Sequence, residues 1–291
     1  MDFKDTFFSR NLSINCKGKR IDFTYPVIMG IVNLTPDSFY DGGKYTDIES
    51  VEKRIDELIK EGANILDFGA FSSRPGASEV SEEEEWKRLS PALKLAREKY
   101  PDKIFSVDTF RSSIAKKALE EYGIDIINDI TGGDADPKMY DLIAESKTPY
   151  IIMHMKGTPF QMEKNPVYDD IVDDLLNYFR KKTEILLSKG VNDIIIDPGF
   201  GFGKNMKDNY KLLSSLEVFQ LFEMPVLIGI SRKSLIKKLL GISHEQSLNS
   251  KTALHMYSLT KGASVLRVHD VREALECINL YKELKKHESE A

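Results

Sequence analysis

Residues 193–204 read Asp-Ile-Ile-Ile-Asp-Pro-Gly-Phe-Gly-Phe-Gly-Lys, a short apolar run that leads into a glycine-rich loop. The apolar run before Asp197 has the length of a β-strand. Pro198 ends the strand and keeps the preceding residue extended, so the carboxylate of Asp197 is held at the strand tip. The glycines that follow let backbone amides approach a ligand closely, and Phe202 offers a flat apolar face. The stretch therefore predicts a buried strand that ends in a binding site.

This stretch has two other interpretations. It is not a nucleoside-triphosphate loop, because Pro198 stands where a glycine is needed and Asn205 where serine or threonine is needed. A tight glycine-rich turn with no chemical role is the remaining alternative. The choice between a site and a turn depends on what the rest of the chain brings to the same place.

Composition limits the class of protein. A chain of 291 residues falls within the range of a single α/β barrel, so we expect one domain over residues 1–291. The net charge of −5 argues against a nucleic-acid partner. Cys16 and Cys277 are too few for a disulfide framework or a thiolate metal site, which fits a reduced cytoplasmic setting. No apolar run approaches the roughly 18 residues of a membrane span, and no signal peptide is evident, so we expect no membrane partner.

Eight apolar runs of strand length follow a hairpin pattern at 12–23, and segments with helical periodicity lie between most of them. The alternation predicts a (β/α)8 TIM barrel, with residues 1–25 as an N-terminal β-hairpin that serves as a lid and 285–291 as a frayed polar tail. The strands are predicted at 27–32, 65–68, 104–107, 124–127, 150–153, 194–196, 226–230 and 264–268. The helices are predicted at 48–61, from 82 onward, and at 112–122, 137–145, 171–188, 246–261 and 271–284.

A doubly wound open sheet is the competing fold. An open sheet concentrates its site at one switch point, whereas a barrel brings all eight strand tips to one mouth. Here nearly every tip carries polar residues, which favours the barrel. These tip residues are Asn33, Ser72–Arg74, Asp108, Asn128 and Asp129, His154, Asp197, Ser231–Lys233, and Arg267 with His269.

The tip residues fall into two chemical groups. Asp108, Asn128, Asp197 and Lys233 combine acceptors and donors that suit the edge of an aminopyrimidinone ring, although each could instead only cap a loop. The second group combines phosphate partners with oxygen ligands for Mg²⁺. It comprises Arg74, Arg267, His269, Asn33 and Asp37. His154 lies between two methionines and is interpreted as a packed core histidine.

Because no Ser-His-Asp set, thiol nucleophile or carboxylate pair is evident, the site is expected to bind, orient and stabilise charge. Diphosphate departing with Mg²⁺ is the chemistry that best fits these groups.

Five motifs, in this order along the chain, resemble the signatures of bacterial dihydropteroate synthases. They are Asn33-Leu-Thr-Pro-Asp-Ser-Phe39, Ser73-Arg-Pro-Gly76, the stretch from Asp197 to Lys204, Ser231-Arg-Lys-Ser234 and Arg267-Val-His-Asp270. The resemblance spans about residues 27–284. It implies a pterin-binding TIM barrel, usually a homodimer, which joins a dihydropterin diphosphate to p-aminobenzoate and is the target of sulfonamides.

The resemblance also implies a role for each matching residue. The pterin would be held by Asp108, Asn128, Asp197 and Lys233. The diphosphate would be held by Asn33, Arg74, Arg267 and His269, with Asn33 as a Mg²⁺ ligand. The p-aminobenzoate pocket would comprise Ser73, Pro75, Phe202, Lys233 and Ser234, with Asp37 and Asp41 in a mobile loop. Asp108, Lys233, Arg267 and His269 would be catalytic. Ser73 and Phe71 depart from the residues that the family commonly has there.

Three other functions compete with this one. A pterin-binding methyltransferase would have no use for a diphosphate clamp, and a phosphate-binding isomerase would need an acid–base pair that the sequence does not offer. A paralogue that binds pterin without turnover would not need every diphosphate residue.

Overall fold

The fold is described by a computed structural model over residues 12–35, 48–71, 80–158, 166–231, 234–243 and 245–288. Eight parallel strands form one sheet in the order β8-β7-β6-β5-β4-β3-β10-β9. These strands are β3 (Val27–Asn33), β4 (Ile65–Gly69), β5 (Ile104–Asp108), β6 (Ile126–Asp129), β7 (Tyr150–Met153), β8 (Ile194–Asp197), β9 (Leu227–Ile228) and β10 (Val265–Val268).

The sheet closes on itself at β8 and β9. Ile196 forms a parallel bridge with Val226, and the amide of Ile196 donates to the carbonyl of Pro225 at 3.0 Å. β9 is the shortest strand and pairs with β10 over only two residues. The predicted TIM barrel is therefore confirmed, and the open doubly wound sheet is excluded.

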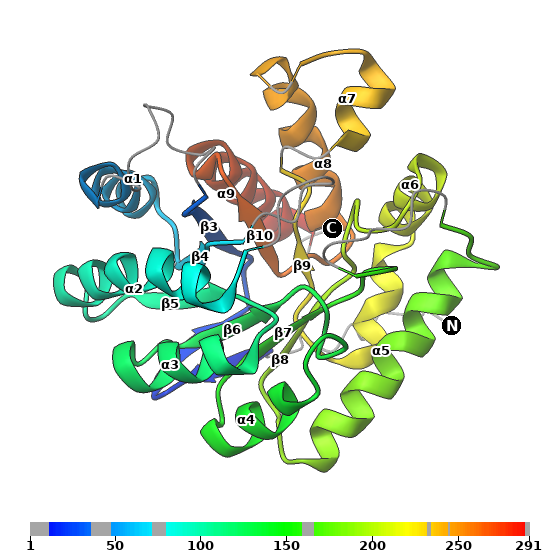
Figure 1. The fold of residues 1–291 in the computed structure, drawn as a ribbon. Coiled ribbons are helices and arrows are strands. Elements are labelled where there is room, and N and C mark those ends of the chain that lie inside the picture. Colours follow the sequence, from blue (N-terminus) through cyan, green and yellow to red (C-terminus); the bar gives the residue numbers. More distant parts are fainter. Residues whose placement is uncertain are drawn as a thin grey trace.

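Helices surround the barrel (Figure 1). They are α1 (Ile48–Glu61), α2 (Glu82–Lys99), α3 (Ser112–Tyr122), α4 (Lys138–Ser146), α5 (Ile171–Ser188), α6 (Met206–Ser214), α7 (Ser234–Leu240), α8 (Leu248–Thr260) and α9 (Val271–Glu288). Two 3-10 helices, η2 (Leu216–Phe222) and η3 (Glu245–Ser247), precede β9 and α8. The sequence did not predict α6, η2 or α7.

The end of α9 corrects the predicted start of the polar tail. The helix continues through residues 285–288 instead of ending at Leu284. Lys285 pairs with Glu288 at 2.8 Å, and Lys286 pairs with Glu283 at 2.8 Å. Ion pairs three residues apart support a helix, so these charges extend α9 instead of fraying it.

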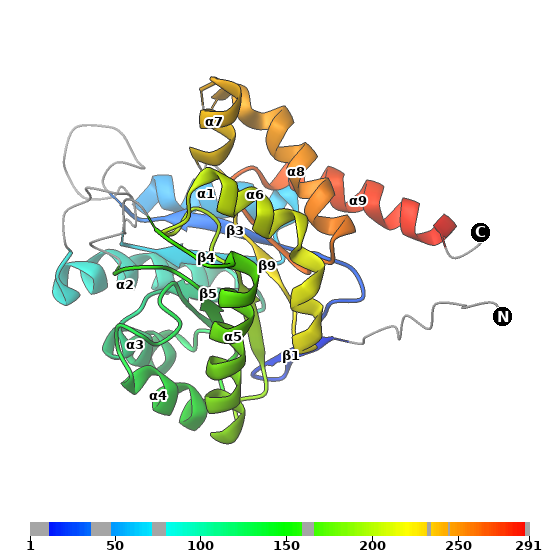
Figure 2. The same cartoon turned by 90° about the vertical axis from the view of Figure 1, so that its right-hand side faces the viewer.

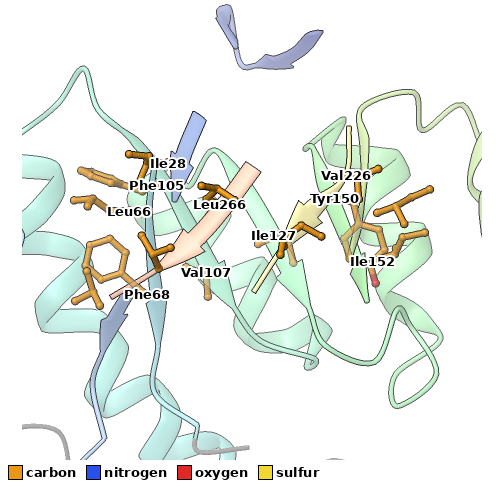
Figure 3. Packing of buried hydrophobic residues seen from close by; sticks show 14 of the residues in the cluster. Ile28, Leu66, Phe68, Phe105, Val107, Ile127, Tyr150, Ile152, Val226 and Leu266 are labelled. Carbon is orange, nitrogen blue, oxygen red and sulfur yellow. The ribbon is translucent and has the colours of Figure 1, made fainter. Parts of the chain in front are cut away.

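Two layers of apolar side chains position the strands. Outward-facing residues such as Leu66, Phe68 and Phe105 pack under the helices, as Figure 3 shows. The rings of Phe68 and Phe105 meet edge to face with centroids 5.6 Å apart. Inward-facing residues near the strand starts form a separate basal layer, which includes Met29, Ile65, Ile126, Ile151, Ile195, Leu227 and Val265.

The N-terminal hairpin, which the sequence predicted, covers the basal end of the barrel. Strands β1 (Ser13–Cys16) and β2 (Lys19–Asp22) pair antiparallel around Lys17 and Gly18, whose φ angles are 53° and 91°. Their apolar side chains join the basal layer, so the hairpin seals the end opposite the strand tips (Figure 2). Within the described residues, no helix is long and apolar enough to cross a membrane.

Candidate active site

The side chains above the basal layer point into the barrel. Successive residues of a strand face opposite sides, so a residue two or four positions beyond a basal residue also faces inward. This rule puts polar side chains from five strands into the interior, toward the strand tips. They are Asp67 of β4, Asp108 of β5, Asn128 of β6, Asp197 of β8 and Arg267 of β10.

Arg267 lies at the centre of this polar set. Its Nη2 is 2.7 Å from Oδ2 of Asp108 and 2.6 Å from Oδ2 of Asp67. Its Nε also donates to Oδ2 of Asp67 at 2.7 Å. Both Arg267 and Asp108 are 21% exposed, whereas Asp67 is fully buried. One guanidinium thus holds two carboxylates, one at the mouth and one beneath it.

Asp67 was not predicted as a site residue. Besides Arg267, it accepts a hydrogen bond from Nδ2 of Asn128 at 3.2 Å. It therefore joins two residues that the sequence had assigned to the pterin and diphosphate sites. The available signal was a charged residue within an otherwise apolar strand, because a buried carboxylate requires a partner.

The environment of Asp108 raises its pKa to about 7. Burial is the main cause, because it disfavours the charged form, and the nearby charge of Asp67 acts in the same direction. The guanidinium of Arg267 opposes both effects. The pKa of Arg267 is raised, because the carboxylates of Asp67, Asp108 and Asp197 outweigh its burial. Asp197 is therefore part of the same electrostatic cluster.

The loop after β8 is organised by two of its own residues. Asp197 accepts the amide of Gly199 at 2.7 Å through Oδ1. Lys204 is buried, and its Nζ donates to the carbonyls of Gly199, Phe202 and His154 at 2.7, 3.1 and 3.0 Å. The lysine that ends the motif thus holds the loop in place and ties it to the tip of β7.

We expect Gly199→Ala to disrupt this loop. A Cβ on Gly199 would lie 2.0 Å from the carbonyl oxygen of His154, and φ at this position is +70°. Gly190→Ala is the matched control, because its φ is +80° but nothing lies within 4 Å of its Cβ. Backbone strain alone costs about 1 kcal/mol in the control, and the clash adds to this cost in Gly199→Ala. Equal melting temperatures and equal activities for the two variants would contradict this expectation.

A second polar set lies at the tips of β3 and β10. Nδ2 of Asn33 is 3.3 Å from Nε2 of His269, and the hydroxyl of Ser231 is 3.1 Å from Nδ1 of the same ring. The backbone carbonyl of His269 accepts a hydrogen bond from Arg54 of α1. Residues more than two hundred positions apart in sequence thus fix one imidazole at the mouth. Ser231 begins one of the motifs, but the sequence did not predict this contact with His269.

An apolar cluster lies on the side of the mouth opposite the polar set of β3 and β10. Phe202 packs with Phe71 and Met155 against a buried group formed by Phe110, Ile130 and Met153. The rings of Phe71 and Phe110 meet edge to face with centroids 5.3 Å apart. The mouth therefore combines charged groups on one side with flat apolar faces on the other, as a site for an aromatic substrate requires.

Several predicted site residues lie outside the described part of the chain. They are Asp37, Asp41, Ser73, Arg74, Pro75 and Lys233, and of Ser234 only the backbone, at the start of α7, is described.

His154 and Asp129 face away from the mouth. His154 is 8% exposed and packs edge to face on Tyr178 with centroids 4.9 Å apart. Burial lowers the pKa of His154 to about 2, so the ring stays neutral, in agreement with its interpretation as a core residue. Asp129 accepts hydrogen bonds from Thr131, Gly133 and Tyr150 and shapes the loop after β6.

Comparison with known proteins identifies the family. The family described as pterin binding enzyme matches residues 29–269. The dihydropteroate synthase of Escherichia coli K12 is 37% identical over 271 residues, which are 92% of this chain and 95% of that protein.

Two solved structures have the same fold. Dihydropteroate synthase of Yersinia pestis, in complex with a sulfonamide drug, superposes with a TM-score of 0.88 at 35% identity and covers 94% of this chain and 100% of its own. The Xanthomonas albilineans enzyme with 4-aminobenzoic acid gives 0.87 at 34% identity, over 94% and 98% of the two chains. These likenesses extend over nearly the whole chain, and the chain belongs to the dihydropteroate synthases of the pterin-binding enzyme family.

Proposed function

We propose that this protein condenses 6-hydroxymethyl-7,8-dihydropterin diphosphate with p-aminobenzoate, forming 7,8-dihydropteroate and releasing diphosphate in folate biosynthesis. One observation carries the proposal: Asp108, Asn128 and Arg267, from three strands, meet at the mouth of the barrel around the buried carboxylate of Asp67, which lies beneath them. The protein's membership of the dihydropteroate synthases supports the choice of substrates.

In this proposal the pterin ring lies over the polar cluster. Asn128 and Asp197 are 3% and 5% exposed, so little water reaches them. Both side chains can therefore form hydrogen bonds with the edge of a flat ring with little competition from water. Asp108 and Lys233 complete the set of donors and acceptors. A carboxylate and an amide together match the exocyclic amine, ring N–H and carbonyl of an aminopyrimidinone.

The reaction breaks the bond between the pterin methylene and the diphosphate oxygen. The electron pair of that bond departs with the diphosphate, and the methylene becomes cationic. Asp108 stabilises this charge from inside the barrel, where the low dielectric strengthens the interaction. The arylamine nitrogen then forms the new C–N bond and gives up a proton to water. The arylamine is neutral near pH 7, so it needs no protein base.

The leaving diphosphate is assigned to the second polar set. His269 and Asn33 lie together at the mouth, and Arg267 and Arg74 would contribute positive charge. Mg²⁺ binds through few protein ligands when phosphates supply the rest, and an amide oxygen is a suitable ligand. Asn33 turns its amide nitrogen toward His269, which fits its oxygen serving as that ligand. Bound Mg²⁺ would neutralise the charge that develops on the diphosphate.

The p-aminobenzoate pocket is assigned to the apolar side of the mouth. Phe202 lies there, and Ser73, Pro75, Lys233 and Ser234 belong to the same proposed pocket. Because a sulfonamide resembles p-aminobenzoate, a sulfonamide should compete with it at this pocket.

The proposed reaction is tested by mixing the protein with the dihydropterin diphosphate and Mg²⁺, and measuring diphosphate before and after p-aminobenzoate is added. Diphosphate release that requires p-aminobenzoate, with dihydropteroate identified by mass, is the expected result. Methyl transfer from a methylfolate to a corrinoid, without diphosphate release, would support the rival methyltransferase and overturn the proposal.

We further propose that the protein works as a homodimer in the cytoplasm. Large apolar side chains are exposed on α7 and α8, where Leu239, Leu240 and Tyr257 are 55%, 51% and 40% exposed. The two helices lie side by side at one edge of the barrel (Figure 1). A second copy of the chain is the partner that would cover these side chains. The buried free thiols of Cys16 and Cys277 fit a reducing compartment.

We expect Leu240→Glu to weaken the dimer. Light scattering should give twice the 33.1 kDa chain mass for the wild-type protein and a lower mass for this variant at the same concentration. Leu187→Glu is the control, because Leu187 is 46% exposed on α5, which packs against α6 and lies away from α7 and α8 (Figure 1). A wild-type protein that sediments as a monomer, or equal loss of the dimer in both variants, would contradict the proposed interface.

A further inference from the structure

We propose that Asp67 is a positioning residue for the reaction, which holds the guanidinium of Arg267 and the amide of Asn128 in their working orientations. This inference rests on the proposed function. It adds to the site a residue that does not reach the mouth and that acts through two residues that do.

Asp67 contacts both Arg267 and Asn128 through one carboxylate oxygen. Oδ2 alone receives Nε of Arg267 at 2.7 Å, Nη2 of Arg267 at 2.6 Å and Nδ2 of Asn128 at 3.2 Å. Two contacts to one guanidinium fix both its place and its plane, which a single contact to Asp108 cannot do. Asp67 therefore determines how Arg267 and Asn128 stand relative to each other.

The burial of Asp67 makes its negative charge costly to the fold. The residue is fully buried, and Cα pairing places it beside Ile31 of β3 and Ser106 of β5 in the interior. A carboxylate there is costly unless its charge is compensated. Arg267 supplies that compensation, but a buried apolar residue would avoid the cost altogether. The arrangement suits a site that needs Arg267 held in place more than it needs a stable core.

The second carboxylate oxygen of Asp67, Oδ1, differs from Oδ2 in its surroundings. Oδ1 of Asp67 and the hydroxyl of Ser106 are both buried without a hydrogen-bond partner among the described residues. A purely structural carboxylate would be satisfied through both oxygens. Asp67 instead concentrates its contacts on Oδ2, the oxygen that faces Arg267 and Asn128.

Several charged groups surround Asp67 and Asp108, and they determine how a substitution of Asp67 changes the pKa of Asp108. Arg267 and Asp197 share the interior with Asp67 and Asp108, while Glu85 of α2 and Asp129 of β6 act on Asp108 from outside it. Among the carboxylates, the charge of Asp67 is the largest that raises the pKa of Asp108. Removal of that charge therefore lowers the pKa of Asp108, provided that Arg267 stays in place.

The test compares Asp67→Asn with Ser106→Ala, which removes the polar group at the neighbouring register position that likewise has no hydrogen-bond partner within the described part of the chain. We expect Asp67→Asn to lower kcat by roughly 10²-fold, since small misplacements of a catalytic group have effects of this size. The KM for p-aminobenzoate should stay within about 2-fold, because that pocket lies on the apolar side of the mouth. Ser106→Ala should match the wild-type protein. Similar losses in both variants would overturn the inference and indicate a packing role.

A double-mutant cycle with Arg267→Lys separates positioning from stability. If Asp67 acts through Arg267, Asp67→Asn should have little further effect on kcat in the Arg267→Lys background. Independent, multiplicative losses would overturn the inference. Should Asp67→Asn not fold, Asp67→Ser removes the same charge with a smaller side chain. Failure of both variants to fold while Ser106→Ala folds would assign Asp67 to stability alone. A wild-type protein without p-aminobenzoate-dependent diphosphate release would instead refute the proposed function.

Discussion

Asp108→Asn is expected to lower kcat by about 10²- to 10³-fold while changing the KM for the dihydropterin diphosphate far less. The substitution keeps the shape and hydrogen-bonding capacity of the side chain but removes the charge that would stabilise the cationic methylene. An interaction made mainly in the transition state affects turnover more than binding. Steady-state kinetics with both substrates measure the two effects. Equal losses in kcat and in substrate affinity would mean that Asp108 binds the substrate and the transition state alike.

The same variant should alter the pH dependence. The pKa of Asp108 is about 7, so kcat/KM of the wild-type protein should fall as the pH is lowered through 7 and the carboxylate is protonated. Asp108→Asn should lack this acid limb. Asp102→Asn is the control, because Asp102 is an exposed carboxylate just before β5. An unchanged limb in Asp108→Asn would assign it to another group.

Stability should respond to pH in the opposite direction. The folded protein holds a proton on Asp108 more tightly than the unfolded chain does, since the ordinary pKa is 3.8. The contribution of Asp108 to the free energy of unfolding therefore declines as the pH rises from about 4 to about 7. Asp108→Asn should remove this part of the pH dependence.

Arg267→Met should be the most destabilising substitution in the site, with an expected loss of about 3–5 kcal/mol near pH 8. It leaves the carboxylates of Asp67 and Asp108 inside the barrel without their shared cation. Part of the loss should be recovered at lower pH, because protonation removes the unpaired charge. Chemical denaturation at several pH values measures both effects. The release of diphosphate should also become too slow to sustain turnover.

Arg272→Met is the control for this substitution. Arg272 is 75% exposed on α9 and pairs with Glu276 at 3.4 Å, so its loss should change the free energy of unfolding by less than about 0.5 kcal/mol. A wild-type melting temperature for Arg267→Met would contradict the central place of this arginine in the cluster.

The barrel could be predicted from the sequence because its signals are local. Apolar runs such as Tyr150–Met153 and helical periods such as Ile171–Ser188 depend on neighbours in the chain, and the structure confirms both sets of bounds. The elements α6 and η2 were missed because they are short and because a 3-10 helix does not follow the period of 3.6 residues. Asn205, which caps α6 and accepts the amide of Asp208 at 2.9 Å, was a readable signal.

The sequence predicted those residues of the candidate site that stand at strand tips, but not those that lie deeper in the barrel or whose contacts depend on a loop. Asp108, Asn128 and Arg267 stand at or near predicted tips, and the closed barrel brings them together. The role of Asp67 could not be predicted, because its partners lie 61 and 200 positions away and meet it only in the interior. The partners of Lys204 depend in the same way on the path of a loop, which no periodic pattern specifies.

Because β9 has only two residues, the barrel should open locally at this strand before it opens elsewhere. Amide hydrogens along this seam should exchange with solvent sooner than those of β3 or β4, because few ladder bonds must break to expose them. The chain that leaves β9 leads directly to Ser231 and then to the Lys233 motif. Ser231, which contacts the ring of His269 at the mouth, is thus attached to the least cooperative strand of the sheet, so exchange at this seam should report on the part of the mouth that holds this imidazole.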